Sequence, residues 1–190
     1  DVYKRQELVA ANQQDLFEDG HSWIGGNPDG DLTIVEFIDY RCGVCRRFNQ
    51  EVHDIVEDDG NIRLVLKEFP ILGQDSEASS RFAVAVKQIA GDEAYRKAHD
   101  ALIELRSPAT IEALKKVAED IGVDPDEIVN TMNTEPVTAV LRENHQLAER
   151  MAIQGTPTFV IGSELLRGVP AAGLTETVSQ IRNAGGSSEG

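Results

Sequence analysis

The pattern of apolar and polar residues begins with a strand, a helix and a second strand. Two continuous apolar runs rich in β-branched residues, LTIVEFI at 32–38 and IRLVLKEF at 62–69, predict buried strands. Between them, from Cys42 onward, apolar residues recur at helical spacing until Gly60, which is typical of a helix end. A strand, a helix and a strand with a short return predict a right-handed, parallel βαβ unit.

The middle and the end of the chain have different patterns. Periodic apolar positions predict a series of helices between about 75 and 150, and Asp124, followed by Pro125, has the pattern of a helix N-cap. The runs 156–162 and 164–168 then predict a hairpin that turns at Gly162-Ser163. A last helix is predicted over 173–185.

These elements predict an α/β fold in which the outer pieces of the chain form one mixed sheet, in the order βαβ … ββα, with helices on its faces. The sheet and its helices are assigned to residues 25–75 and 151–185, and an inserted helical subdomain to residues 76–150. Residues 1–24 are predicted to be an N-terminal helix and linker, and residues 186–190 a frayed tail.

The charge of the chain narrows the list of partners. The 190 residues carry a formal net charge of −15, so nucleic acid and anionic lipid surfaces are repelled and we expect neither as a partner. No apolar run is long enough for a transmembrane helix. The sequence shows no signal peptide and does not begin with Met, so its start does not argue for the cytoplasm.

The chain has two cysteines, Cys42 and Cys45, at the predicted junction of strand and helix. A zinc site needs four ligands, and none of the four histidines has the spacing of a second ligand pair. A structural disulfide across two residues would close almost no loop. A redox role fits better, because the N-terminus of a helix and the neighbouring Arg41, Arg46 and Arg47 stabilise a thiolate.

The residues around this pair resemble a known family. The segment GNPDGDLTIVEFIDYRCGVC is similar to the beginning of the DsbA family of thioredoxin-fold disulfide oxidoreductases. GTPTFVIG at 155–162 resembles the cis-proline loop of that family, and KEFPILG at 67–73 resembles the segment before its helical insertion. The resemblance extends over about residues 24–184 and implies a thioredoxin-like core with an inserted helical subdomain.

The resemblance also implies roles for single residues. Cys42 would be the exposed nucleophile that forms a mixed disulfide with substrate, and the more buried Cys45 would resolve it. Pro157 would follow a cis peptide bond. The backbone of Thr156 would pair with an extended substrate peptide. Gly43-Val44, between the cysteines, would contact substrate and offers no side-chain donor to the thiolate.

Glu36 is a lone carboxyl in the apolar run six residues before Cys42. The related fold keeps an acidic group under the buried cysteine, so Glu36 is predicted to exchange a proton with Cys45. The alternative is a glutamate on an edge strand that faces water. Lys67 is a possible partner of Glu36 from the neighbouring strand, unless it only extends its ammonium group to solvent.

The sequence therefore predicts a thiol–disulfide oxidoreductase that acts on cysteine-containing secreted proteins, with a redox-active disulfide in the chain and no cofactor. By resemblance it would be periplasmic in a bacterium and would exchange electrons with a membrane redox partner. One alternative is a disulfide isomerase or reductase, with oligomers formed through the N-terminal helix at about 6–18. Another is a protein whose two thiolates bind Cu(I).

Overall fold

The computed structural model describes residues 1–187, and it divides into two compact units. The first, called here the sheet unit, consists of residues 1–37, 48–67 and 147 onward. The second, called the helical unit, consists of residues 38–47 and 68–146. The cysteine pair lies in the helical unit, and each unit is described by itself below.

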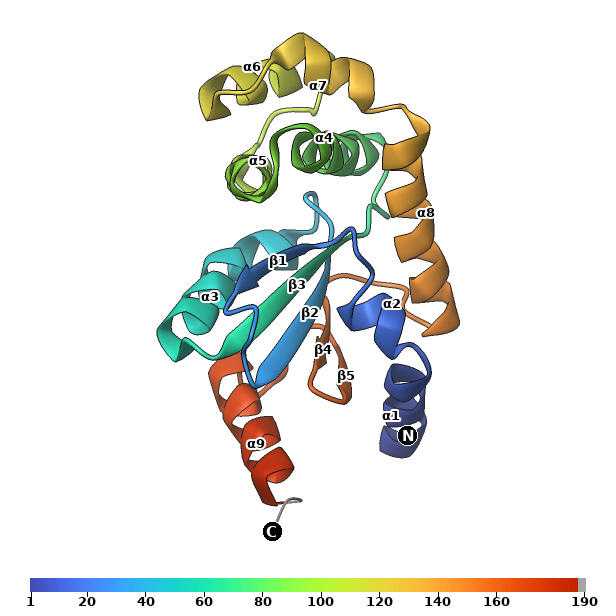
Figure 1. Cartoon of the computed structure of the whole chain (residues 1–190), viewed down its shortest axis with the longest axis vertical. Helices are drawn as coiled ribbons and strands as arrows, with labels where there is room; N and C mark the ends of the chain where they lie inside the picture. Colours follow the sequence, from blue (N-terminus) through green and yellow to red (C-terminus); the bar gives the residue numbers. More distant parts are fainter. Residues whose placement is uncertain (188–190) are drawn as a thin grey trace. The chain divides into compact units, whose positions relative to one another are not determined.

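The sheet unit contains a five-stranded mixed sheet in the order β1-β3-β2-β4-β5 (Figure 1). Strand β2 (Leu32–Ile38) has the predicted bounds, and β3 (Ile62–Glu68) differs from its prediction by one residue. β4 (Thr158–Ile161) pairs antiparallel with β2 and with β5 (Glu164–Arg167). The predicted hairpin is therefore confirmed, with Ile161 opposite Glu164 across the turn.

One strand of this sheet was not predicted. β1 (Trp23–Gly26) pairs antiparallel with β3, and Trp23 lies opposite Leu66. We placed Trp23 and Ile24 in the linker after the N-terminal helix, because the four residues of β1 include two glycines and offer no alternation long enough to indicate a strand. Its place is determined by the free edge of β3, which is far away in sequence.

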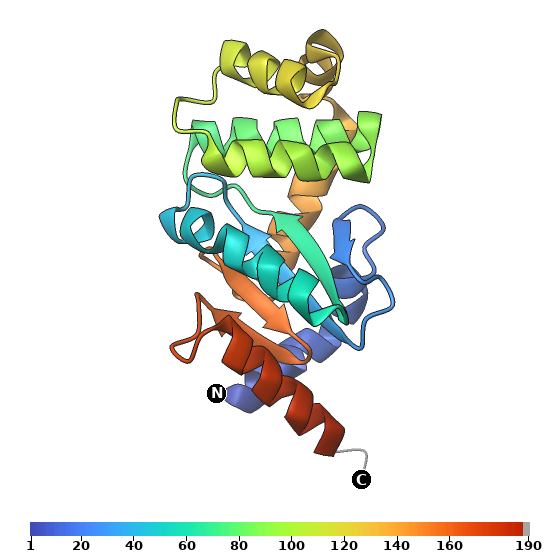
Figure 2. The ribbon, with the colours of Figure 1, turned by 90° about the vertical axis from the view of Figure 1, so that its left-hand side faces the viewer.

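Helices cover both faces of the sheet. The part of α3 (Gly43–Asp59) that belongs to the sheet unit lies with α9 (Leu174–Ser187) on one face, and α1 and α2 lie on the other (Figures 1 and 2). The predicted N-terminal helix is two helices, α1 (Val2–Ala11) and α2 (Gln13–Phe17), separated at Asn12. α9 extends into the predicted tail, and residues 188–190 of that tail lie outside the described range.

The helical unit confirms the predicted run of helices. It contains α4 (Gln74–Ala90), α5 (Asp92–Glu104), α6 (Ile111–Ile121), α7 (Pro125–Thr131) and most of α8 (Glu135–Arg150). Figure 2 shows α4 and α5 side by side, and α4 also contacts α7. The predicted cap is present, because the Asp124 side chain accepts hydrogen bonds from the backbone N–H groups of Asp126 and Glu127.

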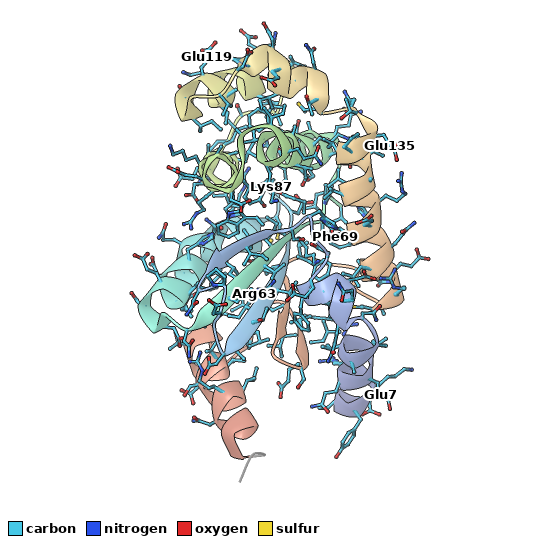
Figure 3. All side chains as sticks on the ribbon, in the orientation of Figure 1. Glu7, Arg63, Phe69, Lys87, Glu119 and Glu135 are labelled. Atoms are coloured by element: carbon cyan, nitrogen blue, oxygen red, sulfur yellow. The ribbon has the colours of Figure 1, made fainter. Side chains whose placement is uncertain are left out.

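The surface has the acidic character that the composition predicts. Glu7, Glu119 and Glu135 are exposed, and their side chains extend from helices α1, α6 and α8 (Figure 3). Among the described residues, no helix combines the length and the apolar character needed to cross a bilayer.

Candidate active site

The cysteine pair lies where the chain leaves β2 and begins α3. The Cys42 N–H donates to the Asp39 carbonyl at 3.1 Å, and the Cys42 carbonyl accepts the Arg46 N–H at 3.0 Å. The Cys45 N–H donates to the sulfur of Cys42 at 3.3 Å. Cys42 is thus the N-cap residue of α3. Its sulfur accepts the Cys45 N–H, one of the first amides of the helix, which have no carbonyl partner within the helix. Such a bond and the positive end of the helix dipole stabilise the thiolate relative to the thiol.

The two cysteines differ less in exposure than we predicted. Cys42 is 7% exposed and Cys45 is 2% exposed, so Cys42 is not the exposed side chain that the resemblance implied. The Cys42 sulfur lies against the first turn of α3, where it accepts the Cys45 N–H. Gly43 is exposed and Val44 is half-buried, so the two residues between the cysteines are more accessible than the cysteines.

Asp39 fixes the shape of this turn. Its buried carboxylate accepts the Arg41 N–H at 2.7 Å and the Ser76 hydroxyl at 2.7 Å. The same carboxylate accepts the backbone N–H groups of Ile71 and Leu72 at 2.8 and 3.1 Å. The Asp39 side chain therefore connects the turn between β2 and α3 that carries Cys42, called here the cysteine turn, to the segment that leads into α4.

A second buried carboxyl, Glu68, lies in the same unit and was not predicted. One of its oxygens accepts the hydroxyls of Tyr40 at 2.6 Å and Tyr95 at 3.0 Å, and the other accepts the Ser80 hydroxyl at 3.0 Å. Tyr40 also lies 3.1 Å from Nδ1 of the buried His99. The only sequence signal was a charged residue at the end of the second apolar run.

Burial raises the pKa of Glu68 to about 7, although the three hydroxyl donors oppose this shift, and the nearby Asp39 raises it further. Burial also raises the pKa of Tyr40, so this hydroxyl stays protonated and continues to donate. The cluster therefore holds a carboxyl group, that of Glu68, which changes charge near neutral pH. Tyr40 connects it to the cysteine pair, because Tyr40 donates a hydrogen bond to Glu68 and precedes Cys42 by two residues.

Arginines connect the cysteine turn to the loop that follows α5. Arg46 Nε donates to the Tyr40 carbonyl at 2.6 Å, and its Nη2 donates to the Leu105 carbonyl at 2.7 Å. Arg41 Nη2 donates to the Ser107 carbonyl at 2.5 Å. Burial and the positive charges of Arg41 and Arg106 lower the pKa of Arg46, which indicates that these like charges lie close together.

The other predicted site residues lie in the sheet unit. The Thr156–Pro157 peptide bond is cis, as predicted, and it directly precedes β4. Glu36 lies on β2 opposite Phe159 and is 4% exposed. Since β2 lies inside the sheet between β3 and β4, the alternative of an edge-strand glutamate facing water is wrong.

Lys67 does not extend to solvent. Its side chain is fully buried, its Nζ donates to the Asp15 carbonyl at 2.6 Å, and it forms an ion pair with Asp19. Burial alone would raise the pKa of Asp19, but Lys67 and the hydrogen bonds of Ser22 outweigh it and lower the pKa to about 2. Asp19 was missed because it precedes the sheet in a segment without a regular pattern.

A mixed sheet with a C-x-x-C pair at the beginning of a helix and a cis-proline before a hairpin defines the thioredoxin class of proteins. The family model described as the DSBA-like thioredoxin domain matches residues 33–181. The chain therefore belongs to the DSBA-like thioredoxin domain family.

Three known proteins are similar to this chain over most of its length. A thioredoxin-like oxidoreductase from Silicibacter pomeroyi DSS-3 is 35% identical, with a TM-score of 0.79 over 94% of this chain and 98% of that one. Disulfide bond formation protein D from Bacillus subtilis is 22% identical over 75% of this chain and 68% of its own length. A Na⁺/H⁺ antiporter, NhaA 1 from Salinispora arenicola, is 25% identical over 73% of this chain, which spans 21% of that protein.

Proposed function

We propose that this chain is a thiol–disulfide oxidoreductase that oxidises or shuffles the cysteines of secreted proteins through a Cys42–Cys45 disulfide. The observation that carries the proposal is the hydrogen bond from the Cys45 N–H to the Cys42 sulfur at the beginning of α3. It favours the thiolate of Cys42, which makes that sulfur both the better leaving group and the more available nucleophile at neutral pH.

In the oxidising direction a substrate thiolate attacks the Cys42 sulfur. The Cys42–Cys45 bond breaks, Cys45 leaves as a thiolate, and a mixed disulfide joins Cys42 to the substrate. A second substrate thiolate then attacks the substrate sulfur of this mixed disulfide, and Cys42 leaves as a thiolate. The substrate has lost two electrons, and the cysteine pair has gained them. No cofactor is needed in these steps, since the cysteine pair is the redox group.

The turn around the pair supplies what these steps need from the protein. Asp39 holds the turn through four hydrogen bonds, and Arg46 holds the Tyr40 carbonyl beside it. A turn held in this way keeps the two sulfurs within reach of each other. The proton role of Glu36 and the substrate-binding roles of Thr156, Pro157, Gly43 and Val44 stay predictions that the family resemblance supports.

The reduced pair must be reoxidised, and we propose a membrane redox partner for this step and an extracytoplasmic location for the protein. Membership of the DSBA-like thioredoxin domain family supports both. The direction of electron flow follows from the potential of the cysteine couple. Equilibration with glutathione measures it: a value of about −120 mV is expected for an oxidase and one of about −270 mV for a reductase.

Trapping of the mixed disulfide tests the mechanism. Cys45→Ser cannot resolve the intermediate, so a cysteine-containing peptide disulfide should leave a covalent adduct on Cys42, visible by mass spectrometry and removed by dithiothreitol. Cys42→Ser should form no adduct and should not catalyse insulin reduction. An adduct on Cys45 in the second variant, or undiminished turnover, would reject Cys42 as the nucleophile.

A further inference from the structure

The cations of the helical unit fall into two groups. Most of them form ion pairs with carboxylates of the same unit: Arg81, Lys87, Arg96, Lys97, Lys115, Lys116 and Arg142. The others are Arg41, Arg46, Arg47 and Arg106, called here the arginine patch. Within the described residues, no ion pair joins a member of the patch to a carboxylate.

This difference is notable because the chain has 33 acidic residues and 18 lysines and arginines. If these arginines only stabilised the fold, we would expect them to form ion pairs with carboxylates, as the other lysines and arginines of the unit do. Instead, the patch gathers like charges around the cysteine turn, and Arg41 and Arg106 both lower the pKa of Arg46. Gathering unpaired like charges opposes folding, which points to a ligand that compensates them.

The hydrogen bonds of the patch fix its position. Arg41 and Arg46 donate to the carbonyls of Ser107 and Leu105, which places the loop that carries Arg106 beside the turn that carries Cys42. These donors bond neutral carbonyl groups, so they orient the guanidinium groups without neutralising them. The nearby Asp39 carboxylate opposes the effect of Arg41 and Arg106 on the pKa of Arg46, but it does not outweigh them. Arg47 and Arg106 are exposed, and they can contact a molecule in solution.

We propose that the arginine patch is a docking surface for acidic segments next to the reacting cysteine of a polypeptide substrate. The proposal rests on the proposed function and adds a substrate class to it. A guanidinium binds a carboxylate through two parallel hydrogen bonds, which orients as well as attracts it. The net charge of the chain is −15, so it repels such a segment over most of its surface, whereas the patch attracts the segment beside Cys42.

Matched peptides test this proposal. Three peptides differ only in the residues beside a single cysteine, which are Glu, Gln or Lys, and each is presented as a mixed disulfide. The wild type should react fastest with the Glu peptide, and the preference should weaken as the salt concentration rises.

Arg47→Gln and Arg106→Gln should each reduce the Glu-to-Lys ratio of kcat/KM by up to about fivefold, mainly through KM. Arg142→Gln, an exposed arginine of the same unit, is the control and should leave the ratio unchanged.

Two further measurements separate docking from redox chemistry. Peptides with serine in place of cysteine report docking alone, and the Glu form should bind more tightly than the Lys form whether or not the protein is an oxidoreductase. Reaction with bis(2-hydroxyethyl) disulfide, which is neutral, reports the chemistry alone. If Arg47→Gln and Arg106→Gln slow all three peptides and the neutral disulfide equally, the patch acts on the thiolate and the docking proposal is wrong. Equal binding of the Glu and Lys serine peptides to the wild type would also overturn it.

Discussion

The Tyr40 hydroxyl donates a 2.6 Å hydrogen bond to the buried carboxyl group of Glu68. Tyr40 precedes Cys42 by two residues, and its carbonyl accepts a hydrogen bond from Arg46 in the first turn of α3. The tyrosine therefore connects the cysteine turn to a carboxyl group whose pKa is raised to about 7. The environment of the turn depends on whether Glu68 carries a charge.

Glu68 should make stability depend on pH between about 4.5 and 7. Its pKa is higher in the folded chain than the ordinary value of 4.5, so the folded state binds this proton more tightly. The stability from this group is complete below the ordinary pKa and is lost as pH rises through the folded pKa, by about 3 kcal/mol in all. Glu68→Gln should remove this dependence, which urea unfolding at pH 5, 6, 7 and 8 measures.

The control for this prediction is Glu112→Gln, because Glu112 is an exposed glutamate of the same unit. It should keep the pH dependence of the wild type. If Glu68→Gln and the wild type lose stability in parallel from pH 5 to pH 8, the carboxyl group of Glu68 does not titrate in this range.

Asp39→Ala should destabilise the protein by about 3 kcal/mol. The substitution leaves the Ser76 hydroxyl and the backbone N–H groups of Arg41, Ile71 and Leu72 without their acceptor in a buried region. Asp39→Asn retains one acceptor oxygen and should lose less. Chemical unfolding measures both, and a loss below about 1 kcal/mol for the alanine variant would show that water replaces the carboxylate.

Asp19→Asn should cost about 3 kcal/mol at pH 7, because it removes the carboxylate that pairs with the fully buried Lys67. Since the pKa of Asp19 is lowered to about 2 from 3.8, its contribution is present above pH 3.8 and is lost as pH falls toward 2. Unfolding in urea at pH 7 and pH 3 measures the difference from the wild type, which should shrink at the lower pH.

The matched control is Asp29→Asn, an exposed aspartate in the same unit. It should change stability by less than about 0.5 kcal/mol. A similarly small effect of Asp19→Asn at pH 7 would contradict the assigned ion pair.

Gly26→Ala should also destabilise the sheet unit, by about 2 kcal/mol or more. Gly26 has a φ of +67°, and an added Cβ would lie 2.4 Å from the Ile62 carbonyl oxygen and 2.5 Å from Val56 Cγ1. Gly185→Ala, in helix α9 with open space around it, should have the opposite sign. Thermal unfolding of the two variants tests the difference in sign.

Local patterns in the sequence were enough for much of the fold. The run at 32–38 predicted β2 at its observed bounds, because a central strand is buried on both faces and is therefore mostly apolar along its whole length. The Asp124 cap predicted the beginning of α7, since an N-cap acts within three residues of itself. The place of Cys42 just before a helix and of Cys45 in its first turn was also predicted, because it depends only on the neighbouring segments.

The partners of buried polar groups could not be predicted in this way. Glu68 accepts hydrogen bonds from Tyr40, Ser80 and Tyr95, which are distant from it in the sequence. Lys67 forms an ion pair with Asp19, which is also distant in the sequence. No local pattern encodes such pairs, because a hydrogen bond forms between groups that packing brings together and not between groups at a fixed spacing. The same holds for β1, a short strand that the free edge of β3 orders.

The sequence by itself thus determined the class of fold and the place of the reacting sulfurs, because helix periodicity, strand burial and capping are local properties of the chain. Only the tertiary structure decided which charges surround the cysteine turn. It buried Glu68 beside Tyr40 and placed Arg106 beside Arg41 and Arg46. Charges interact through space, so the electrostatic environment of Cys42 depends on how distant segments of the chain pack.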